Sequence, residues 1–280
     1  MASIFYVDGQ FVEAQNATIP VDDLALLRGY GVFDFLRTYN GKPFYLEAHV
    51  NRLFQSAAGI GLHLPWSKPQ VIDIVTETLA KNHYSESNIR ILVTGGSSDD
   101  GITPMGNSRL LVMITGLKPK PAWWYEKGVS LATYRTERDF PCAKSINYIA
   151  AIHALRKAEK AGAVEALYIG EDQHVLECTT SNFFGFKGDT LVTPDSNILP
   201  GITRQVVLEL ASKVFRVEQR PVSLEELPRL DEVFITSSTR EVLPIVRIDD
   251  MTFSQGKPGS RTLHVMRLFS DFVKEYARSR

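Results

Sequence analysis

Three short stretches decide how this chain can be interpreted: K-S-I-N-Y at residues 144–148, E-C-T-T-S-N-F-F at 177–184 and L-P-G-I-T-R at 199–204. Lys144 lies among mostly apolar neighbours, and a partly desolvated lysine has the lowered pKa that a carbonyl-attacking amine needs. Glu177 is followed by no further charge through Gly185, which favours a buried carboxylate. The third stretch opens a helix, whose free N–H groups and dipole attract anions. The three stretches therefore supply an amine, a carboxylate and an anion site.

Composition excludes several classes of protein. The chain has 280 residues, 44% hydrophobic and 22% charged, enough to bury a large core and to form two domains. A net charge of −1 with interspersed signs offers no basic surface for nucleic acid. The N-terminus lacks the pattern of a signal peptide, and no apolar run approaches the roughly 20 residues that span a bilayer. Two cysteines, Cys142 and Cys178, are too few for a disulfide framework, so we expect a cytoplasmic protein without membrane contact.

Hydrophobic spacing and turn signals predict alternating helices and strands. Asp8-Gly9 and Asn40-Gly41 each mark a hairpin, between strands at 4–7 and 10–13 and at 35–39 and 42–45. Apolar residues at helical spacing predict helices at about 46–62, 69–82, 147–161, 203–213 and 262–277. Further strands are expected at 88–94, 109–115, 129–134, 165–169, 182–187, 190–193 and 232–236.

A domain boundary is predicted within residues 117–128, which contain two prolines and the aromatic run Trp123–Tyr125. Proline disfavours both helix and central strand, so this segment is interpreted as a linker. An ordinary connecting loop is the alternative. The expected organisation is a small N-terminal α+β domain at 1–116 and a larger C-terminal cofactor-binding domain at 129–280, with the active site in the cleft between them.

The three stretches, in this order and spacing, resemble the class IV aminotransferases, the fold-type IV group of pyridoxal-phosphate enzymes. The similarity extends from Tyr6-Val7-Asp8-Gly9 to the final helix. It implies a two-domain α+β fold like that of D-amino acid aminotransferases, pyridoxal 5'-phosphate as cofactor and a homodimer in which the small domain reaches the partner's site. No metal is expected.

The resemblance implies a role for each residue of the cofactor site. Lys144 would bind the cofactor aldehyde and move protons during the reaction. Glu177, in the pattern E-x-[ST]-x-[ST]-N-x-F, would keep the pyridine nitrogen protonated. Tyr148 follows Lys144 by one helical turn, so the two side chains are expected on one face. The full set of implied cofactor-binding residues is Arg52, Lys144, Tyr148, Glu177, Asn182, Leu199, Ile202, Thr203, Ser237 and Ser238.

The substrate site is less completely specified. D-transaminases usually carry T-R-G at the end of the strand at 88–94, but this chain has Thr94-Gly95-Gly96. Arg90 resembles an arginine of branched-chain enzymes, and Arg28 one of an atypical D-transaminase branch. A second arginine of that branch would fall at Thr180. The residues expected to contact substrate are Arg28, Tyr30, Phe33, Arg90 and Thr239.

Three interpretations of the function are considered: two reactions and one non-enzymatic function. The leading interpretation is a transaminase that moves an amino group between an α-amino acid and a 2-oxo acid such as 2-oxoglutarate or pyruvate. The short K-S-x-N spacing and Arg28 favour D-amino acids over branched-chain L-amino acids. Aminodeoxychorismate lyase, an elimination that uses the same cofactor and releases pyruvate, is the alternative. The non-enzymatic interpretation is a binding protein that kept the fold. It leaves unexplained why every expected cofactor position is filled.

Overall fold

The computed structural model describes residues 2–278, which fold into two compact units. Of the described residues, the N-terminal unit comprises 2–118, Cys142–Tyr148 and 277–278, and the C-terminal unit comprises Pro119–Pro141 and Ile149–Tyr276. The division differs from the predicted one in a functionally important place. The segment that carries Lys144 belongs to the N-terminal unit, although it lies well beyond the expected linker.

The helices are α1 (Leu24–Arg28), α2 (Leu46–Gly59), α3 (Lys68–Ala80), α4 (Trp123–Lys127), α5 (Ile149–Lys160), α6 (Ile202–Ala211) and α7 (Ser260–Arg278). The first strands are β1 (Ile4–Val7), β2 (Gln10–Glu13), β3 (Gly31–Tyr39), β4 (Lys42–Pro43), β5 (Ser87–Thr94) and β6 (Arg109–Gly116). The later strands are β7 (Val129–Arg135), β8 (Glu165–Ile169), β9 (His174–Cys178), β10 (Asn182–Lys187), β11 (Thr190–Thr193), β12 (Arg216–Gln219), β13 (Val222–Ser223), β14 (Glu232–Ser237), β15 (Glu241–Ile248) and β16 (Met251–Thr252).

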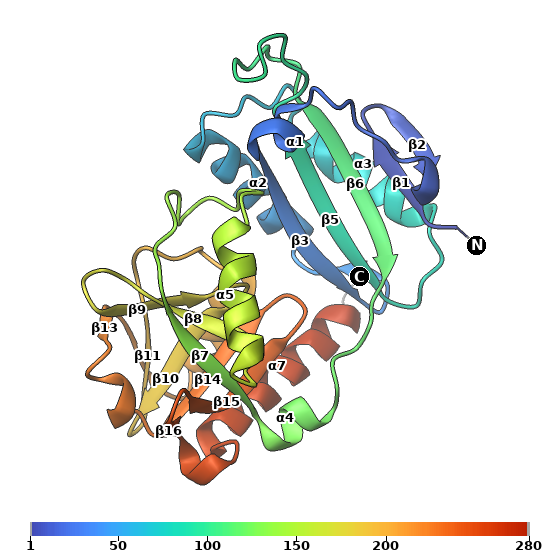
Figure 1. Ribbon diagram of the computed structural model, residues 1–280. Helices are drawn as coiled ribbons and strands as arrows, with labels where there is room; N and C mark the ends of the chain where they lie inside the picture. Colours follow the sequence, from blue (N-terminus) through green and yellow to red (C-terminus); the bar gives the residue numbers. More distant parts are fainter. Residues whose placement is uncertain (1, 279–280) are drawn as a thin grey trace. The chain divides into compact units, whose positions relative to one another are not determined.

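The N-terminal unit is a six-stranded antiparallel sheet in the order β2-β1-β6-β5-β3-β4. Helices α2 and α3 cover one face, and the core between them includes Val32, Leu36, Ile89 and Val93 (Figure 1). Because side chains alternate along a strand, Phe33 and Phe35 of β3 point to the opposite face. That face carries the chemically important residues described below.

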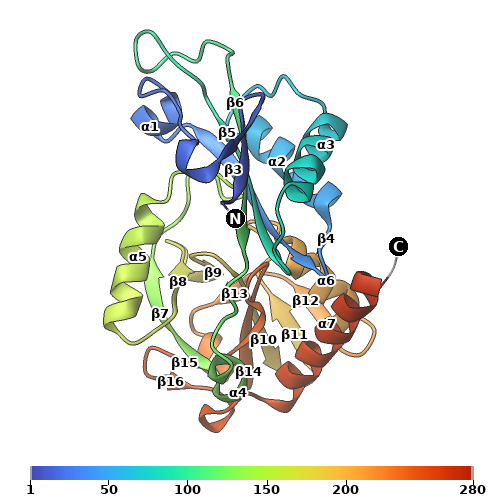
Figure 2. The same cartoon turned by 90° about the vertical axis from the view of Figure 1, so that its right-hand side faces the viewer.

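The C-terminal unit contains a sheet of ten strands that closes on itself. Its strands run in the order β12-β11-β10-β14-β15-β7-β8-β9-β13, with β16 paired to β15. A further pairing of β9 with β10, through Glu177 and Asn182, joins the ring β10-β14-β15-β7-β8-β9. A closed ring removes the exposed edge that an open sheet would present. Helix α5 lies against β7 and β8 (Figure 2), where Ala154 and Ala158 pack on Ala166.

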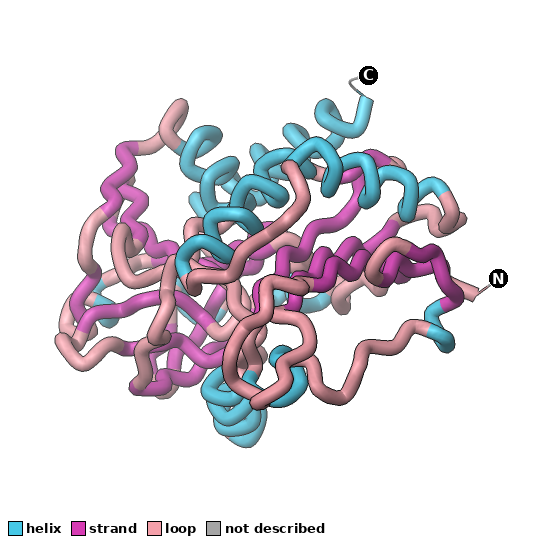
Figure 3. The backbone as a smooth tube through the Cα atoms, turned by 90° about the horizontal axis from the view of Figure 1, so that it is seen from above, coloured by secondary structure: helices cyan, strands magenta, loops and turns pink. Residues whose placement is uncertain are grey.

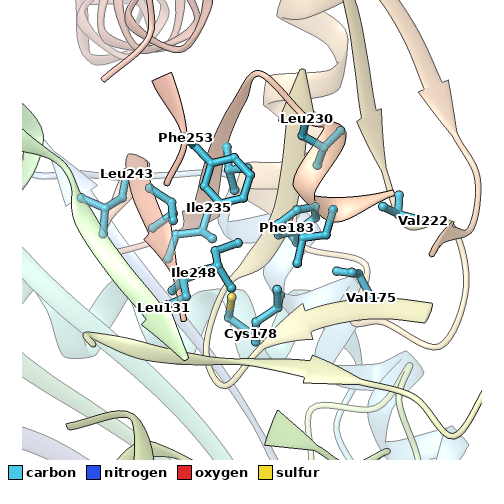
Figure 4. Packing of buried hydrophobic residues seen from close by; sticks show 14 of the residues in the cluster. Leu131, Val175, Cys178, Phe183, Val222, Leu230, Ile235, Leu243, Ile248 and Phe253 are labelled. Carbon is cyan, nitrogen blue, oxygen red and sulfur yellow. The ribbon is translucent and has the colours of Figure 1, made fainter. Parts of the chain in front are cut away.

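Large apolar side chains fill the core of this unit. Leu131, Phe183, Ile235 and Leu243 come from strands of the ring and point toward one another (Figure 4). Phe184, the next residue after Phe183, points the other way and stacks on Phe234 with 4.9 Å between ring centroids. The aromatic layer continues through Phe186 and Phe215 to His264 of α7, the long helix that leads to the C-terminus (Figure 3).

Most expected elements are present, with two kinds of departure. The two hairpins and the five long helices form within a few residues of the predicted bounds. Strands β9, β12, β13, β15 and β16 had no clear pattern and were missed. Helix α4 lies inside the segment expected to be a linker, because its aromatic residues Trp124 and Tyr125 pack on the core of the C-terminal unit.

Candidate active site

Lys144 is fixed by its backbone to the beginning of β3. Its N–H donates to Ser56 Oγ of α2 (3.0 Å), and its carbonyl accepts from the N–H of Phe33 (2.9 Å). Ile146 N–H donates to the carbonyl of Gly31 (3.1 Å), so the segment pairs with β3 as a short additional strand. A Cβ on Gly31 would lie 2.7 Å from the carbonyl oxygen of Val93 and 3.0 Å from Ile146. Glycine at this position therefore permits the close approach that positions Lys144.

Three predicted site residues contact the Phe33 ring. Lys144 Nζ lies 4.8 Å from its centroid, and the Tyr148 ring meets it edge-to-face with centroids 5.6 Å apart. The Arg90 guanidinium carbon lies 5.0 Å from the same centroid and 5.1 Å from that of Phe35. Arg90 is opposite Phe35 in the β3–β5 pairing, which puts its side chain on this face of the sheet. An amine, a phenol and a guanidinium thus surround one aromatic ring.

The helical argument that paired Tyr148 with Lys144 is wrong. Residues 144–148 are not helical, and α5 begins only at Ile149. The two side chains meet because both contact Phe33, a tertiary relationship that sequence spacing does not reveal.

Arg90 has no ion-pair partner among residues 2–278. Burial lowers the pKa of its guanidinium, and the neighbouring Tyr148 opposes that effect. Contacts of the Arg90 guanidinium with the Phe33 and Phe35 rings compensate part of the free-energy cost of desolvating this cation. A half-buried guanidinium without a carboxylate is a ready site for an anionic ligand.

Arg52 is engaged by a buried carboxylate. Its Nε and Nη2 donate to Asp34 Oδ2 (2.9 Å) and Oδ1 (2.8 Å), and His49 Nδ1 lies 2.6 Å from Asp34 Oδ1. Burial alone would raise the pKa of Asp34, but the charges and hydrogen bonds of Arg52 and His49 hold it well below its usual range. Asp34 therefore orients the Arg52 guanidinium. The sequence did not suggest Asp34 as the partner of Arg52.

Glu177 lies inside strand β9, whereas the sequence predicted a position just before a strand. Its side chain is buried, as expected, and its oxygens accept from three groups. Arg138 Nη2 lies 2.7 Å from Oε1, while the Leu199 N–H (3.1 Å) and Asn182 Nδ2 (3.3 Å) donate to Oε2. Arg138 was missed, and the only available signal was its position shortly before Lys144 in the sequence.

Asn182 connects Glu177 to the start of α6. Its Nδ2 also donates to the carbonyl of Leu199 (2.9 Å), and a Cβ on Gly201 would lie 2.0 Å from its Oδ1. Glycine is therefore required where this loop crosses Asn182. Helix α6 begins at Ile202, and Gly201 provides no side-chain cap, so the first N–H groups are left for another acceptor.

Two buried hydroxyls at the end of β14, those of Thr236 and Ser237, have no hydrogen-bond partner within the described part of the chain. A buried polar group without a partner is costly, so each needs an explanation. Thr203 in the first turn of α6 is also buried, whereas Leu199, Ile202, Ser238 and Thr239 are half-buried. Adjacent side chains in a strand point to opposite faces, so the hydroxyls of Thr236 and Ser237 lie on opposite faces of β14.

Arg28 and Tyr30 have hydrogen-bond partners outside the Phe33 cluster. Arg28 is exposed at the end of α1, and its Nη1 donates to the carbonyl of Leu27 (2.8 Å). Tyr30 donates to the carbonyl of Ile60 (3.5 Å) and packs on Gly95, where an added Cβ would lie 2.5 Å from its ring. Among the predicted substrate residues of the N-terminal unit, Phe33 contacts Lys144 and Arg90 contacts the same Phe33 ring.

Comparisons with known proteins identify the family. The family model for class IV amino-transferases matches residues 31–248. This chain is a class IV aminotransferase. It is 34% identical to a putative branched-chain-amino-acid aminotransferase of Methanocaldococcus jannaschii over 95% of each chain. It is 33% identical to a D-alanine aminotransferase of Listeria monocytogenes over 98% of this chain and 96% of that one. A branched-chain amino acid aminotransferase from T.th., solved with pyridoxamine 5'-phosphate, superposes with a TM-score of 0.92, 27% identity and coverage of 98% and 95%.

The aminotransferase depends on pyridoxal phosphate, and its residues fit that cofactor. The uncapped start of α6 and the unpartnered Ser237 hydroxyl suit a phosphate. The buried Glu177 carboxylate suits a protonated ring nitrogen, and Lys144 is an amine of the kind that the cofactor aldehyde needs. Among residues 2–278, no cluster of acidic, histidine or cysteine side chains could hold a metal ion. In the same range, no helix has the length and apolar character needed to cross a bilayer.

Proposed function

We propose that this aminotransferase moves the amino group of an α-amino acid to a 2-oxo acid and that Arg90 binds the substrate α-carboxylate. The observation that carries this proposal is the Arg90 guanidinium, which shares the Phe33 ring with Lys144 and has no carboxylate partner among the described residues. An α-carboxylate held by Arg90 would bring the substrate to the amine, and the apolar rings around it suit a small or apolar side chain.

The roles of the cofactor residues form part of the proposal. When bound, the cofactor supplies an electron sink for the substrate α-carbon. Lys144 Nζ would hold the cofactor covalently and move the proton. Glu177, held by Arg138 and Asn182, would keep a proton on the ring nitrogen. The start of α6, Ser237 and Ser238 would bind the phosphate, and Arg52, oriented by Asp34, is proposed as a further phosphate ligand.

We further propose that D-amino acids are the preferred donors. The short K-S-I-N-Y spacing supports this preference, since it resembles the D-transaminase branch more than the branched-chain one. Purified enzyme should be mixed with paired D- and L-amino acids without an acceptor, and conversion of the cofactor to its amino form followed by absorbance. Faster conversion with D-enantiomers supports the proposal, and faster conversion with L-leucine or L-valine contradicts it. Release of pyruvate from aminodeoxychorismate without an acceptor would instead indicate a lyase.

Arg90→Gln tests the carboxylate site. The KM for amino acids should rise about ten- to a hundredfold, the usual effect of one lost charge-assisted hydrogen bond, while that for 1-phenylethylamine, a donor without a carboxylate, stays nearly constant. Arg37→Gln is a matched control, because Arg37 also stacks on an aromatic ring, 4.3 Å from the Tyr39 centroid. Equal changes in both KM values for Arg90→Gln would contradict the assignment.

The proposal includes a homodimer in which Arg28 acts in the partner's site. Val21 (79% exposed), Leu26 (62%) and Ile102 (66%) present apolar side chains at α1 and the loop beside it. Such exposed apolar residues are typical of interfaces. Arg28→Leu and Lys144→Ala chains should each be inactive, but mixed subunits should recover about a quarter of wild-type activity, because random pairing restores one site in half of the dimers. No recovery after subunit exchange, shown by a tag on one chain, would contradict this role.

A further inference from the structure

Arg204 is the charged residue of the L-P-G-I-T-R stretch at 199–204. It lies in the first turn of α6 and is buried, with only 7% of its surface exposed. A Cβ added to Gly201 would lie 3.3 Å from the Cβ of Arg204, so Arg204 packs closely against the residue before the helix. A guanidinium is therefore held inside the C-terminal unit at the same helix start that is proposed to bind the cofactor phosphate.

The Arg204 guanidinium fixes the loop between β11 and α6. Its Nη2 donates to the carbonyl of Pro194 (2.8 Å), the first residue of that loop, and to Gln219 Oε1 at the end of β12 (3.1 Å). The loop also carries Leu199, whose N–H donates to Glu177 (3.1 Å). Because Arg204 follows the loop and bonds to its first residue, it closes the loop and sets where α6 begins.

The charge of Arg204 has no ion-pair partner among residues 2–278. Its hydrogen bonds go to a carbonyl and an amide, which are neutral, and its Nε is buried without a partner in the described part of the chain. Burial lowers the pKa of Arg204, and the charges of Asp195 and Glu177 oppose that effect. Asp195 is exposed, and Glu177 is bound to Arg138. A buried cation with neutral partners is costly unless an anion binds nearby.

A cation at this place is opposite to the usual preference of helices. The first N–H groups give a helix start a partial positive charge, which favours acidic residues there and disfavours arginine. Helix α6, all of which the structure describes, has no acidic residue in its first turn. The Arg204 guanidinium therefore adds to the positive potential at this helix start, and a bound dianion would be stabilised by both.

We propose that Arg204 is a positioning residue that strengthens binding of the cofactor phosphate. It fixes the loop that precedes α6 and adds an uncompensated positive charge near the helix start, while the phosphate is contacted by other groups. The inference rests on the phosphate site proposed above at α6.

Two ring compounds separate the phosphate from the rest of the cofactor. Pyridoxal 5'-phosphate and 5'-deoxypyridoxal share the ring and the aldehyde, and absorbance measures the Kd of each for the full-length apoprotein. The Kd of 5'-deoxypyridoxal divided by that of pyridoxal 5'-phosphate is the phosphate preference. Arg204→Gln should lower this preference about five- to thirtyfold, the range for a charge at a partly buried helix end. Arg204→Lys keeps the charge and should lower the preference less.

Arg220→Gln is the matched control. Arg220 is paired with Glu218 (3.1 Å) and Glu226 (2.7 Å), so its charge is already compensated, and its loss should leave the phosphate preference unchanged. An equal rise of both Kd values in Arg204→Gln would show that Arg204 only supports the fold and would overturn the inference. Unchanged Kd values, or equal losses of preference in Arg204→Gln and Arg204→Lys, would also overturn it.

Gln219→Glu tests the charge without removing Arg204. A carboxylate at position 219 keeps an acceptor for Arg204 Nη2 and also neutralises the guanidinium. It should raise the melting temperature of the apoprotein and lower the phosphate preference severalfold, two opposite effects that a purely structural arginine does not produce. If Arg204→Gln does not fold, an unchanged phosphate preference in Gln219→Glu overturns the inference.

Thr203→Ala distinguishes failure of this inference from failure of the proposed phosphate site. Thr203 lies in the same turn of α6 and is buried. If Thr203→Ala leaves the phosphate preference unchanged, the phosphate site proposed at α6 is wrong, and the role of Arg204 is overturned with it. If Thr203→Ala lowers the preference but Arg204→Gln does not, the site stands and only the role of Arg204 is overturned.

Discussion

Asn182 donates its side-chain N–H to Glu177 (Nδ2–Oε2, 3.3 Å) at the register pair that joins β9 to β10. The same nitrogen donates to the carbonyl of Leu199, and the Leu199 N–H returns a hydrogen bond to Glu177. The strand ring, the Glu177 carboxylate and the start of α6 are therefore tied together by one amide. This arrangement sets the distance between the proposed ring-nitrogen and phosphate sites.

Borohydride reduction should fix the cofactor on Lys144. The two backbone hydrogen bonds fix the segment that carries this amine, and Lys144 Nζ lies 4.8 Å from the centroid of the Phe33 ring, so one defined lysine is presented to an aldehyde. Peptide mapping after reduction measures the position of the label. A label on any other lysine would show that the site is misassigned.

Glu177→Gln should retain the cofactor but slow the half-reaction. The amide fills the same space and can still accept from Leu199, but it cannot neutralise Arg138 or hold a proton on the ring nitrogen. Losing one charge-assisted contact of roughly 1.5–3 kcal/mol predicts a fall of about ten- to a hundredfold or more. Stopped-flow absorbance measures the rate, and a rate near that of the wild type would mean that Glu177 has a structural role only.

Ser237→Ala should weaken cofactor retention without destabilising the apoprotein. Its buried hydroxyl has no partner among the described residues, so removing it breaks no hydrogen bond there, but a phosphate would lose a hydrogen bond of about 1.5–3 kcal/mol. Thr236→Val is the matched control, since Thr236 has an equally unpartnered hydroxyl on the opposite face of β14. Dialysis followed by absorbance measures retention. Equal loss from both variants, or from neither, would contradict the proposed phosphate site.

Thr203→Ala and Arg52→Ala should both weaken cofactor retention, but only Arg52→Ala should also destabilise the apoprotein strongly. Removing Arg52 leaves Asp34 as a buried charge without its bidentate partner, which typically costs about 3–5 kcal/mol. Urea denaturation of the apoproteins separates the two effects. Restoration of stability in Arg52→Ala by a second change, Asp34→Asn, would support this explanation. A stable Arg52→Ala apoprotein would contradict it.

His49 should make stability fall at mildly acidic pH. Burial lowers the pKa of His49, Asp34 opposes that effect, and the charges of Arg52 and Lys144 lower the pKa further. Below the unfolded-state value of about 6.5, the unfolded chain therefore takes up a proton that the folded chain resists, and stability decreases as pH falls toward the lower folded value. His49→Gln should flatten the dependence of the melting temperature on pH between about 7 and 5. His153→Gln, at an exposed position of α5, should leave the dependence unchanged.

Local patterns predicted much of the fold. Asp8-Gly9 and Asn40-Gly41 favour tight hairpins by their own conformational preferences, and apolar spacing predicted α2, α3, α5, α6 and α7 within a few residues. Strand β15 was missed because it is buried along most of its length and contains Pro244, so it lacks both the alternation and the composition of a typical strand. Strand β9 has five residues, too few for a clear alternating pattern, and was not predicted.

The sequence by itself determined the family, the cofactor and the candidate residues, because an amine, a carboxylate and a helix start occur there in a diagnostic order. Tertiary structure alone decided which charges are compensated. Arg52 is paired with Asp34, Glu177 with Arg138 and Arg240 with Glu165, whereas Arg90 has no such partner among residues 2–278. Charge compensation depends on distances of a few ångströms between residues far apart in the chain, and no local pattern encodes those distances. For the same reason, Tyr148 meets Lys144 on the Phe33 ring rather than along a helix.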